Sequence, residues 1–380
     1  MKKSLIALAF GTLALGMTEF LMMGILSDVA ADLNITIPEA GHLVSAYALG
    51  VAFGATLLAV ASRFRPKNIL LFLVSLVFFG ALLSTLAPSY GIFLVARFVS
   101  GLPHGAYFGV ASIMAVRLAD EGHKAGAVSI MVAGMTVANL FGVPLGTALC
   151  SHISWRAPFI LVMFYSLLVL YYIWKWVPQL DPTPSNGMKG QFRFLKSGAP
   201  WLILAGTLLG NGSVFCFYSY VTPILTTDSG IRPEYMSMIM VVAGFGMVVG
   251  NLTGGKLSDR YTAGRVSAAM LLVSALSLAA IFFFAQNAVA AVAFTIMAVF
   301  GMFAMGGPQQ YLIIRHAPGG EMLGGACIQM AFNMGNAVGA FLGGLPIAAG
   351  LADRYAALVG APMALVATVL MAVFFMKYEK

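Results

Sequence analysis

The chain alternates between long hydrophobic runs and short polar breaks. Each run holds about 20 mostly apolar residues, the length a helix needs to cross the hydrocarbon core of a bilayer. The breaks combine turn-forming residues with charge, as at 63–67, 120–124 and 259–265. The pattern predicts twelve spanning helices, near residues 5–27, 39–61, 68–87, 91–116, 125–150, 156–176, 200–224, 235–257, 264–285, 288–314, 323–349 and 356–376.

The longest polar stretch, residues 177–198, is rich in Pro, Gly and Lys and divides the predicted spans six and six. Sequence features repeat across this division at an offset near 197. Arg63-Phe64 matches Arg260-Tyr261, Asn139 and Gly142 match Asn336 and Gly339, and Arg156 matches Arg354. Six-plus-six repeats are a transporter architecture with the solute site near mid-membrane. We therefore expect an all-α membrane protein of two pseudo-symmetric six-helix bundles, residues 1–176 and 200–380, joined by a cytoplasmic linker at 177–199.

Composition supports this class. Hydrophobic residues make up 60% of the chain and charged residues 9%, whereas soluble domains carry about 25% charged residues. With the N-terminus inside, 17 of the 21 Lys and Arg fall in cytoplasmic segments, as the positive-inside rule requires. Both termini are then cytoplasmic. Basic residues beside anionic lipid account for the net charge of +8 without a nucleic-acid partner.

Sequence motifs of enzyme chemistry are missing. We find no metal-ligand spacing, no nucleophile beside a base and no phosphate-binding loop. The three cysteines, Cys150, Cys216 and Cys327, lie in apolar stretches and suggest neither a disulfide framework nor a metal site. We therefore expect no enzymatic activity, no metal and no cofactor. The apolar run that starts near residue 5 is too long for a signal peptide, so we take it as a retained first span.

Two ionisable residues, Glu19 and Arg97, lie deepest in the predicted spans. Glu19 is about 12 Å from the outer end of the first span and Arg97 about 9 Å from that of the fourth, at a rise of about 1.5 Å per residue. Their similar depth permits an ion pair. Intramembrane charges are functional by default, so Glu19 is our candidate proton-coupling acid; the alternative is a permanent structural pair. His104, two turns from Arg97, is a candidate for proton exchange or a packing histidine.

Neutral polar residues within the spans are candidate solute contacts or interhelical hydrogen-bonding groups. Amides and phenols suit a neutral polar solute such as a sugar or nucleobase. Among them, Gln309 and Gln310 follow Pro308, and a helix disturbed by proline exposes side chains. The candidates are Tyr47, Tyr107, Asn139, Asn211, Tyr218, Gln309, Gln310, Gln329 and Asn333.

Two further motifs concern helix packing and gating. Gly142 and Gly146 are small residues at four-residue spacing, which lets helices approach closely, and Pro144 between them kinks the helix. Asp259, Arg260 and Arg265 form either a solvated loop or a clamp between helices.

Four stretches resemble the major facilitator superfamily, and within it the drug:H⁺ antiporter type. GGKLSDRYTAGR (254–265) is similar to the gate motif, RFVSGLPHGAYFG (97–109) to the Arg-plus-glycine motif and GMTVANLFGVPLG (134–146) to the antiporter motif. GMTEFLMMGIL (16–26) resembles the sugar- and purine-exporter branch. The first-half loop ASRFRPKNIL (61–70) departs from the family, because it lacks the usual acidic residue.

The resemblance implies how the candidates work. The first and fourth spans line a central cavity, the kink at Pro144 seals the outer half against proton leak, and Asp259 with its arginines clamps the cytoplasmic gate. It implies a monomeric, proton-coupled exporter of a small solute in a bacterial inner membrane. A passive facilitator remains the main alternative, and a non-transporting membrane sensor a weaker one. The solute itself stays open between sugar, nucleoside and amphipathic drug.

Overall fold

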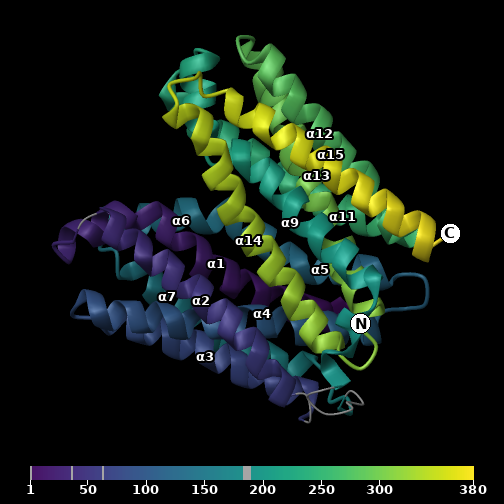
Figure 1. The fold of residues 1–380 in the computed structure, drawn as a ribbon. Coiled ribbons are helices and arrows are strands. Elements are labelled where there is room, and N and C mark those ends of the chain that lie inside the picture. Colours follow the sequence, from purple (N-terminus) through teal and green to yellow (C-terminus); the bar gives the residue numbers. More distant parts are fainter. Residues whose placement is uncertain (1, 36, 62–63, 183–189) are drawn as a thin grey trace. The chain divides into compact units, whose positions relative to one another are not determined.

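A computed structural model describes residues 2–35, 37–61, 64–182 and 190–380, and Figure 1 follows the chain from purple at α1 to yellow at α15. Among these residues the regular elements are helices, and the predicted all-α class is confirmed. Each predicted span coincides with a helix or an interrupted helix. These are α1 (Lys2–Asp32), α2 (Ile37–Ala61), α3 (Pro66–Leu86), α4 (Tyr90–Leu118), α5 (Lys124–Val137) continued by η1 (Ala138–Gly142) and α6 (Val143–His152), α7 (Ala157–Trp176), α9 (Gly198–Tyr218), α11 (Met236–Arg260), α12 (Ala263–Phe284), α13 (Ala288–Arg315), α14 (Glu321–Ala348) and α15 (Tyr355–Tyr378).

Within the described part of the chain, ten helices are long and apolar enough to cross a membrane. α2 and α14 are not among the ten. α14 carries amides and several glycines along its length, which lower its hydropathy relative to runs rich in Leu and Phe. The multi-pass character predicted from the hydrophobic runs is thus supported by helix length and composition.

Helix ends follow local chemistry. Pro66 stands at the first position of α3, where its missing N–H costs nothing. The Thr262 side chain accepts a hydrogen bond from the Arg265 backbone N–H and caps α12. The Asn287 side chain likewise accepts from the Ala290 N–H, at 3.0 Å, and caps α13, which three residues separate from the end of α12. This cap explains why so short a break separates two spans.

The fifth span is not a uniform α-helix. α5 passes into a π-helical turn, η1 (Ala138–Gly142), and continues as α6 (Val143–His152) with Pro144 in its first turn. A proline has no N–H to donate and its ring crowds the preceding turn, and a π-turn is one way in which a helix absorbs such a fault. The predicted disturbance at Pro144 is therefore present as a change of helical register.

The structure comprises two compact units. The first contains Met1–Ala119, Ile130–Phe194 and Ala317–Cys327; in it α4 packs on α1, α2 and α3, and α7 packs on α1 and α3. The second contains Asp120–Ser129, Leu195–His316 and Ile328–Lys380; in it α12 packs on α13 and α15, α11 on α13, and α9 on α15. The start of α5 thus counts with the second unit and the start of α14 with the first. The division at 177–199 expected from the sequence stays a prediction.

In each unit, an aspartate carboxylate accepts hydrogen bonds from residues far along the chain. In the first, Asp32 accepts hydrogen bonds from Trp155 Nε1 at 2.8 Å and from the Arg156 guanidinium at 2.9 Å. In the second, Asp228 accepts from the Arg354 backbone N–H at 2.7 Å. The repeat noted for the two arginines therefore extends to an acid that each one contacts.

Candidate functional site

Three helices of the first unit bring polar side chains together in its interior. Glu19 comes from α1, Tyr47 from α2, and Arg97 and His104 from α4. We refer to these four residues as the buried-charge cluster. Arg97 and His104 have no exposed surface and Glu19 is 9% exposed. The sequence-based expectation that Glu19, Arg97 and His104 share one region of the interior agrees with this arrangement.

Arg97 is held by backbone rather than by a carboxylate. One guanidinium nitrogen donates to the Thr18 carbonyl at 2.8 Å, and Nε donates to the Leu43 carbonyl at 3.4 Å. The guanidinium carbon lies 4.6 Å from the centre of the Tyr47 ring, in cation–π range. Two neighbouring helices and an aromatic face thus fix the charge at the centre of the bundle.

The direct ion pair between Glu19 and Arg97 that equal depth permits is not formed at 4.0 Å or less. Instead, Glu19 Oε2 lies 3.7 Å from His104 Nδ1. That oxygen is buried and has no hydrogen bond among the described residues. The position of a residue along its helix sets the depth of the side chain but not its direction around the helix axis. The Arg97 guanidinium bonds to the Thr18 carbonyl instead of the expected Glu19 carboxylate.

His104 is bound by Tyr47. The Tyr47 hydroxyl and His104 Nδ1 are 2.7 Å apart, and the two rings meet edge to face. The other side of the imidazole stacks on Phe108 with ring centres 5.3 Å apart. A hydrogen bond and a stacking partner hold the ring, so His104 presents one fixed nitrogen to both Tyr47 and Glu19.

The antiporter-like segment packs directly on α1. A Cβ on Gly146 would overlap the Leu21 side chain, and one on Gly142 would lie 3.2 Å from Met17 Cγ. Both glycines are buried, whereas Pro144 between them is exposed. The expected tight packing by small residues is therefore observed, and Pro144 acts on the backbone rather than at a contact. A proton-sealing role stays a prediction.

The second unit holds a layer of amides, which we call the amide layer: the buried Gln309, Gln310 and Gln329, and the partly buried Asn333. Thr207 donates to Gln309 Oε1 at 2.9 Å, and Gln329 Nε2 donates to Gln310 Oε1 at 2.9 Å. Asn333 donates to the Gln329 carbonyl. Gln309 Nε2 is buried and has no hydrogen-bond partner in the described chain. The layer therefore offers a donor that a solute hydroxyl or carbonyl could take.

The remaining candidates, Tyr107, Asn139, Asn211 and Tyr218, contact neighbouring backbone and side chains. Tyr107 donates to the Leu8 carbonyl at 3.1 Å, and Asn139 reaches the Met135 carbonyl of its own helix at 3.5 Å. Asn211 donates to the Phe332 carbonyl at 3.1 Å and to the Asn336 side chain. Tyr218 is half-buried and stands edge-on to a neighbouring phenylalanine. The hydrogen bonds of Tyr107 and Asn211 join two helices, that of Asn139 stays within its own helix, and a role for any of the four in solute contact stays a prediction.

The gate motif contacts the start of α5. Asp259 accepts hydrogen bonds from the N–H groups of Ala125 and Gly126, each at 2.9 Å. The first N–H groups of a helix have no intrahelical acceptor, and a carboxylate there is favoured by the helix dipole. Asp259, which belongs to α11, therefore caps the N-terminus of α5. Asp259 thus joins α11 to the start of α5, and its role as a gate clamp stays a prediction.

The arginines of the motif do not join that cap. Arg260 and Arg265 are exposed and both approach the ring of Tyr261, at 5.5 and 5.8 Å from its centre. The Arg265 backbone contributes to the cap of α12 through Thr262. They are therefore charges at the helix boundary, and the interhelical contact rests on Asp259.

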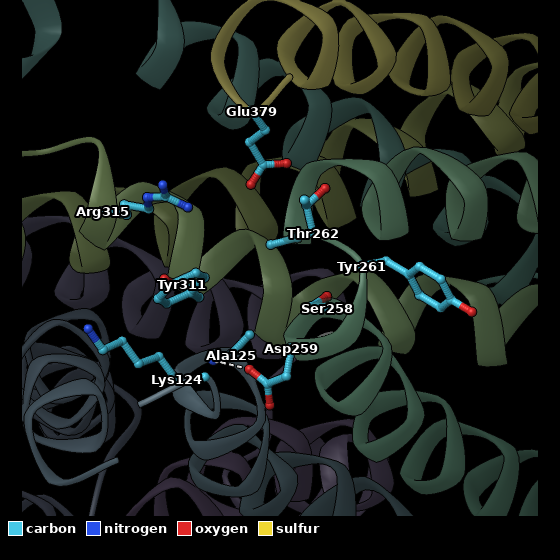
Figure 2. Close-up of a pocket in the computed structure, with 11 residues that line it drawn as sticks. Lys124, Ala125, Ser258, Asp259, Tyr261, Thr262, Tyr311, Arg315 and Glu379 are labelled. Carbon is cyan, nitrogen blue, oxygen red and sulfur yellow. Dashed lines mark hydrogen bonds between the residues drawn. The ribbon is translucent and has the colours of Figure 1, made fainter. Parts of the chain in front are cut away.

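A pocket of about 430 Å³ opens beside this cap within the second unit. Figure 2 shows the hydrogen bond from Ala125 to Asp259, with the basic side chains of Lys124 and Arg315 near Tyr311. On its other side, Glu379 accepts from the Gly264 N–H at 2.8 Å and caps α12. Carboxylates thus satisfy two helix N-termini at the same place.

Sequence reasoning missed three contributors. Tyr47 was a candidate solute contact, and its contacts to His104 and Arg97 appear only when α2 packs on α4. Asn336 was used as a repeat marker but is the partner of Asn211. Asn251, whose amide donates to the Ser129 carbonyl at 2.7 Å, carries no motif. A polar residue in an apolar run was the one signal available for Asn251.

Comparisons with known proteins cover nearly the whole chain. A family model described as Major Facilitator Superfamily matches residues 8–324 and 205–380. AraJ of Escherichia coli (strain K12) is 44% identical over 359 residues, 94% of this chain and 91% of AraJ. The inner membrane transport protein YdhP of the same strain is 34% identical over 361 residues, 95% of this chain and 92% of YdhP.

Solved structures agree in fold. FucP in its outward conformation superposes with a TM-score of 0.80 at 18% identity, covering 97% of this chain and 98% of FucP. A second crystal structure of the same protein, described as the Escherichia coli fucose:proton symporter, gives a TM-score of 0.78 at 16% identity over the same shares. At such identities the likeness concerns the fold alone.

Proposed function

Because this chain belongs to the major facilitator superfamily of membrane transporters, we propose that it is a proton-coupled exporter of a small neutral polar or amphipathic solute, working by alternating access. Export follows from the resemblance of residues 16–26 and 134–146 to the exporter and antiporter motifs. A bacterial inner membrane, a monomer and cytoplasmic termini belong to the same proposal. The strong bias of Lys and Arg toward one side supports the orientation.

The observation that carries the proposal is Glu19. Its carboxylate is buried, with one oxygen lacking a hydrogen bond among the described residues and an imidazole nitrogen 3.7 Å away. A charged group at the bilayer centre costs about 2.5–3.5 kcal/mol on insertion scales. A static role would be expected to offset that cost with a full set of hydrogen bonds. An under-bonded carboxylate beside a histidine suits a group that gains and loses a proton.

The amide layer supports a neutral solute. Its members are uncharged, and Gln309 has a spare buried N–H donor. A site built to bond a hydroxyl discriminates strongly against analogues that lack it, since its polar groups are then left unpaired. FucP, described as a fucose:proton symporter, joins a sugar and a proton in the same fold, and we carry both over as parts of the proposal.

The gate follows from Asp259. When its carboxylate caps α5, the start of that helix is held against α11, and release of the cap would free it. Alternating access needs an element with two arrangements of similar free energy. A cap made of two hydrogen bonds has a suitable strength, of about 0.5–1.5 kcal/mol.

Purified protein in lipid vesicles with an imposed pH gradient tests the proposal. A panel of sugars, nucleosides and amphipathic drugs is offered, and one compound is expected to show saturable flux that depends on the gradient. Glu19→Gln should lower gradient-driven flux at least about tenfold and leave solute exchange without a gradient intact. Glu234→Gln, which neutralises an exposed carboxylate, is the matched control.

The outcomes separate the alternatives. Full gradient-driven transport by the Glu19→Gln protein would exclude Glu19 as the coupling acid. Saturable flux of a compound that ignores the pH gradient in the unaltered protein would identify a passive facilitator instead. Absence of flux for every compound offered, together with saturable binding of one of them, would favour a sensor.

A further inference from the structure

The end of α15 contacts the first turn of α12. Glu379, which directly follows α15, accepts a hydrogen bond from the Gly264 N–H at 2.8 Å. The first N–H groups of a helix have no acceptor within the helix, and the Thr262 side chain takes the next one, of Arg265. A Cβ on Gly264 would lie 2.5 Å from Glu379 Oε2 and 2.9 Å from a ring carbon of Phe374. The missing side chain of Gly264 therefore lets the end of α15 come close enough for this bond.

The end of α15 is also packed against the end of α13. The ring of His316, which directly follows α13, meets the rings of Phe374 and Tyr378 edge to face, with ring centres 5.1 and 6.3 Å away. α13 in turn packs on α11 and α12. Glu379 therefore reaches α12 from a helix end that aromatic contacts hold in place.

Two residues connect α11 to α12. The Tyr261 N–H donates to the Leu257 carbonyl at 2.8 Å and ends α11, and Thr262 caps α12. Asp259, which caps α5, lies one residue before the end of α11. Figure 2 shows Asp259 and Glu379 among the residues that line one pocket. Because both ends of so short a turn are hydrogen-bonded, the last turn of α11 must share a movement of the first turn of α12.

We propose that Glu379 is a positioning residue of the gate, since it holds the turn between α11 and α12 in the place from which Asp259 caps α5. This inference rests on the gate role proposed for Asp259 and names a second residue that controls the gate. While Glu379 is bonded to Gly264, the two caps stabilise the same arrangement of the turn. When Glu379 leaves, the first turn of α12 and the end of α11 gain freedom, and the cap on α5 weakens.

The surroundings of Glu379 allow it to leave α12. The residue is half-buried and lines a pocket, so solvent can reach its carboxylate. Lys124 and Arg315 line the same pocket and offer the released carboxylate other partners. An element that switches needs two arrangements of similar free energy, and the pocket provides the second one for Glu379.

A second hydrogen bond holds α5 to α11 beyond the cap. The Asn251 side chain, on α11, donates to the Ser129 carbonyl of α5 at 2.7 Å. This bond involves neither α12 nor Glu379. The cap can therefore open at the start of α5 while the next turn stays in place, and the amides of Ala125 and Gly126 report on that opening.

Hydrogen–deuterium exchange of the full chain, resolved at single residues, tests the proposal. Glu379→Ala removes the acceptor of the Gly264 amide, whose exchange should rise about 2–13-fold. Exchange at the α5 amides, 125 and 126, should rise at least about twofold, the smallest coupling expected between residues that share a network. The matched control Lys380→Ala alters the neighbouring exposed charge and should change none of these amides.

A double variant separates positioning of Asp259 from general loosening of the fold. In the protein that already carries Asp259→Ala, Glu379→Ala should raise exchange at Gly264 and cause no further rise at the α5 amides. In both backgrounds the Ala127 amide, which does not bond to Asp259, should keep its exchange rate. A residue that merely stabilised the fold would change Ala127 as well, and its effect would add to that of Asp259→Ala.

The outcomes distinguish this inference from the proposed function. The role of Glu379 would be overturned if the α5 amides kept their exchange rates in Glu379→Ala, whether or not Gly264 changed. It would equally be overturned if Ala127 rose as much as the α5 amides, or if the effect of Glu379→Ala persisted undiminished in the Asp259→Ala protein. Proton-coupled transport fails on a separate measurement, the gradient-driven flux of the Glu19→Gln protein, which does not enter the exchange pattern.

Discussion

The cap that Asp259 places on α5 can be measured one amide at a time. Ala125 and Gly126 donate their N–H groups to the two carboxylate oxygens of Asp259, at 2.9 Å each. The next amide, of Ala127, donates to the His123 carbonyl at 3.0 Å and does not depend on Asp259. Asp259→Ala should therefore expose two amides and leave the third protected.

The size of the effect follows from the geometry. Replacing a capping carboxylate by alanine costs about 0.5–2 kcal/mol. Asp259 is partly exposed, so solvent screens its charge and the upper end of the range is not expected. A loss of about 0.5–1.5 kcal/mol corresponds to a factor of about 2–13 in an opening equilibrium. Asp259→Asn retains one acceptor oxygen and should produce a smaller increase, confined to one amide.

Hydrogen–deuterium exchange resolved at single residues over 122–130 is the assay. Exchange at 125 and 126 is expected to rise about 2–13-fold in the alanine variant, with 127 as an internal reference. Arg260→Gln alters the adjacent exposed charge and should change neither amide. Unchanged exchange at 125 and 126 would refute the cap, and an equal rise along all of α5 would mean that the helix as a whole had loosened.

Two other expected outcomes concern stability. Gly339→Ala places a methyl group against the backbone of α9. Overpacking should destabilise the protein by about 1–3 kcal/mol, reduced by the gain of about 1 kcal/mol in helix propensity, so its melting temperature in detergent should fall. The control Gly306→Ala, whose added Cβ has its nearest neighbour at 3.9 Å, should keep or raise the melting temperature, and equal melting temperatures of the two variants would contradict this. Hydrogen bonds from Trp155 and then Arg156 lower the pKa of Asp32, which lies beyond the spanning part of α1. A carboxyl whose pKa is lower in the folded state stabilises the fold at pH values above its unfolded-state pKa, and this stabilisation is lost as the pH falls. On acidification from about pH 5 to 3, the free energy of unfolding of the unaltered protein should therefore fall by up to about 1 kcal/mol more than that of Asp32→Asn. Melting temperatures that fall in parallel for the two proteins would contradict this expectation.

The positions of the helices could be predicted from the sequence, because the length and the apolar character of each hydrophobic run determine them. The predicted break at 286–287 is real, and Asn287 makes it sharp by capping α13. The disturbance at Pro144 was predicted from the missing N–H, but its form as a π-turn was not. How a helix absorbs a proline depends on what packs against it, here Met17 and Leu21 of α1.

The partners in the buried-charge cluster were harder to foresee. A rise per residue gives depth, so Glu19 and Arg97 were placed at one level. Their directions depend on how α1, α2 and α4 turn about their axes when they pack. Arg97 donates to the backbone carbonyls of Thr18 and Leu43. Because every residue has a backbone carbonyl, the sequence does not indicate which ones an arginine will contact.

The same limit applies to Asp259. Its motif predicted either a solvated loop or a clamp between helices, and it did not indicate which group Asp259 contacts. The observed partner is the start of α5, more than a hundred residues earlier in the chain. A helix N-terminus binds anions through groups common to all helices, so tertiary docking alone decides which terminus is used.

The π-turn at 138–142 has the backbone of a one-residue insertion into an otherwise regular helix. Removing a single residue there would let the hydrogen-bond ladder run unbroken, and it would rotate everything downstream by about 100° about the axis. Gly146 would then point away from Leu21, and a bulkier neighbour would take its place against α1. An insertion or deletion in this segment would consequently change which residues of the following helix face α1. Relatives that keep the glycine contacts should therefore keep the length of the turn as strictly as its residues.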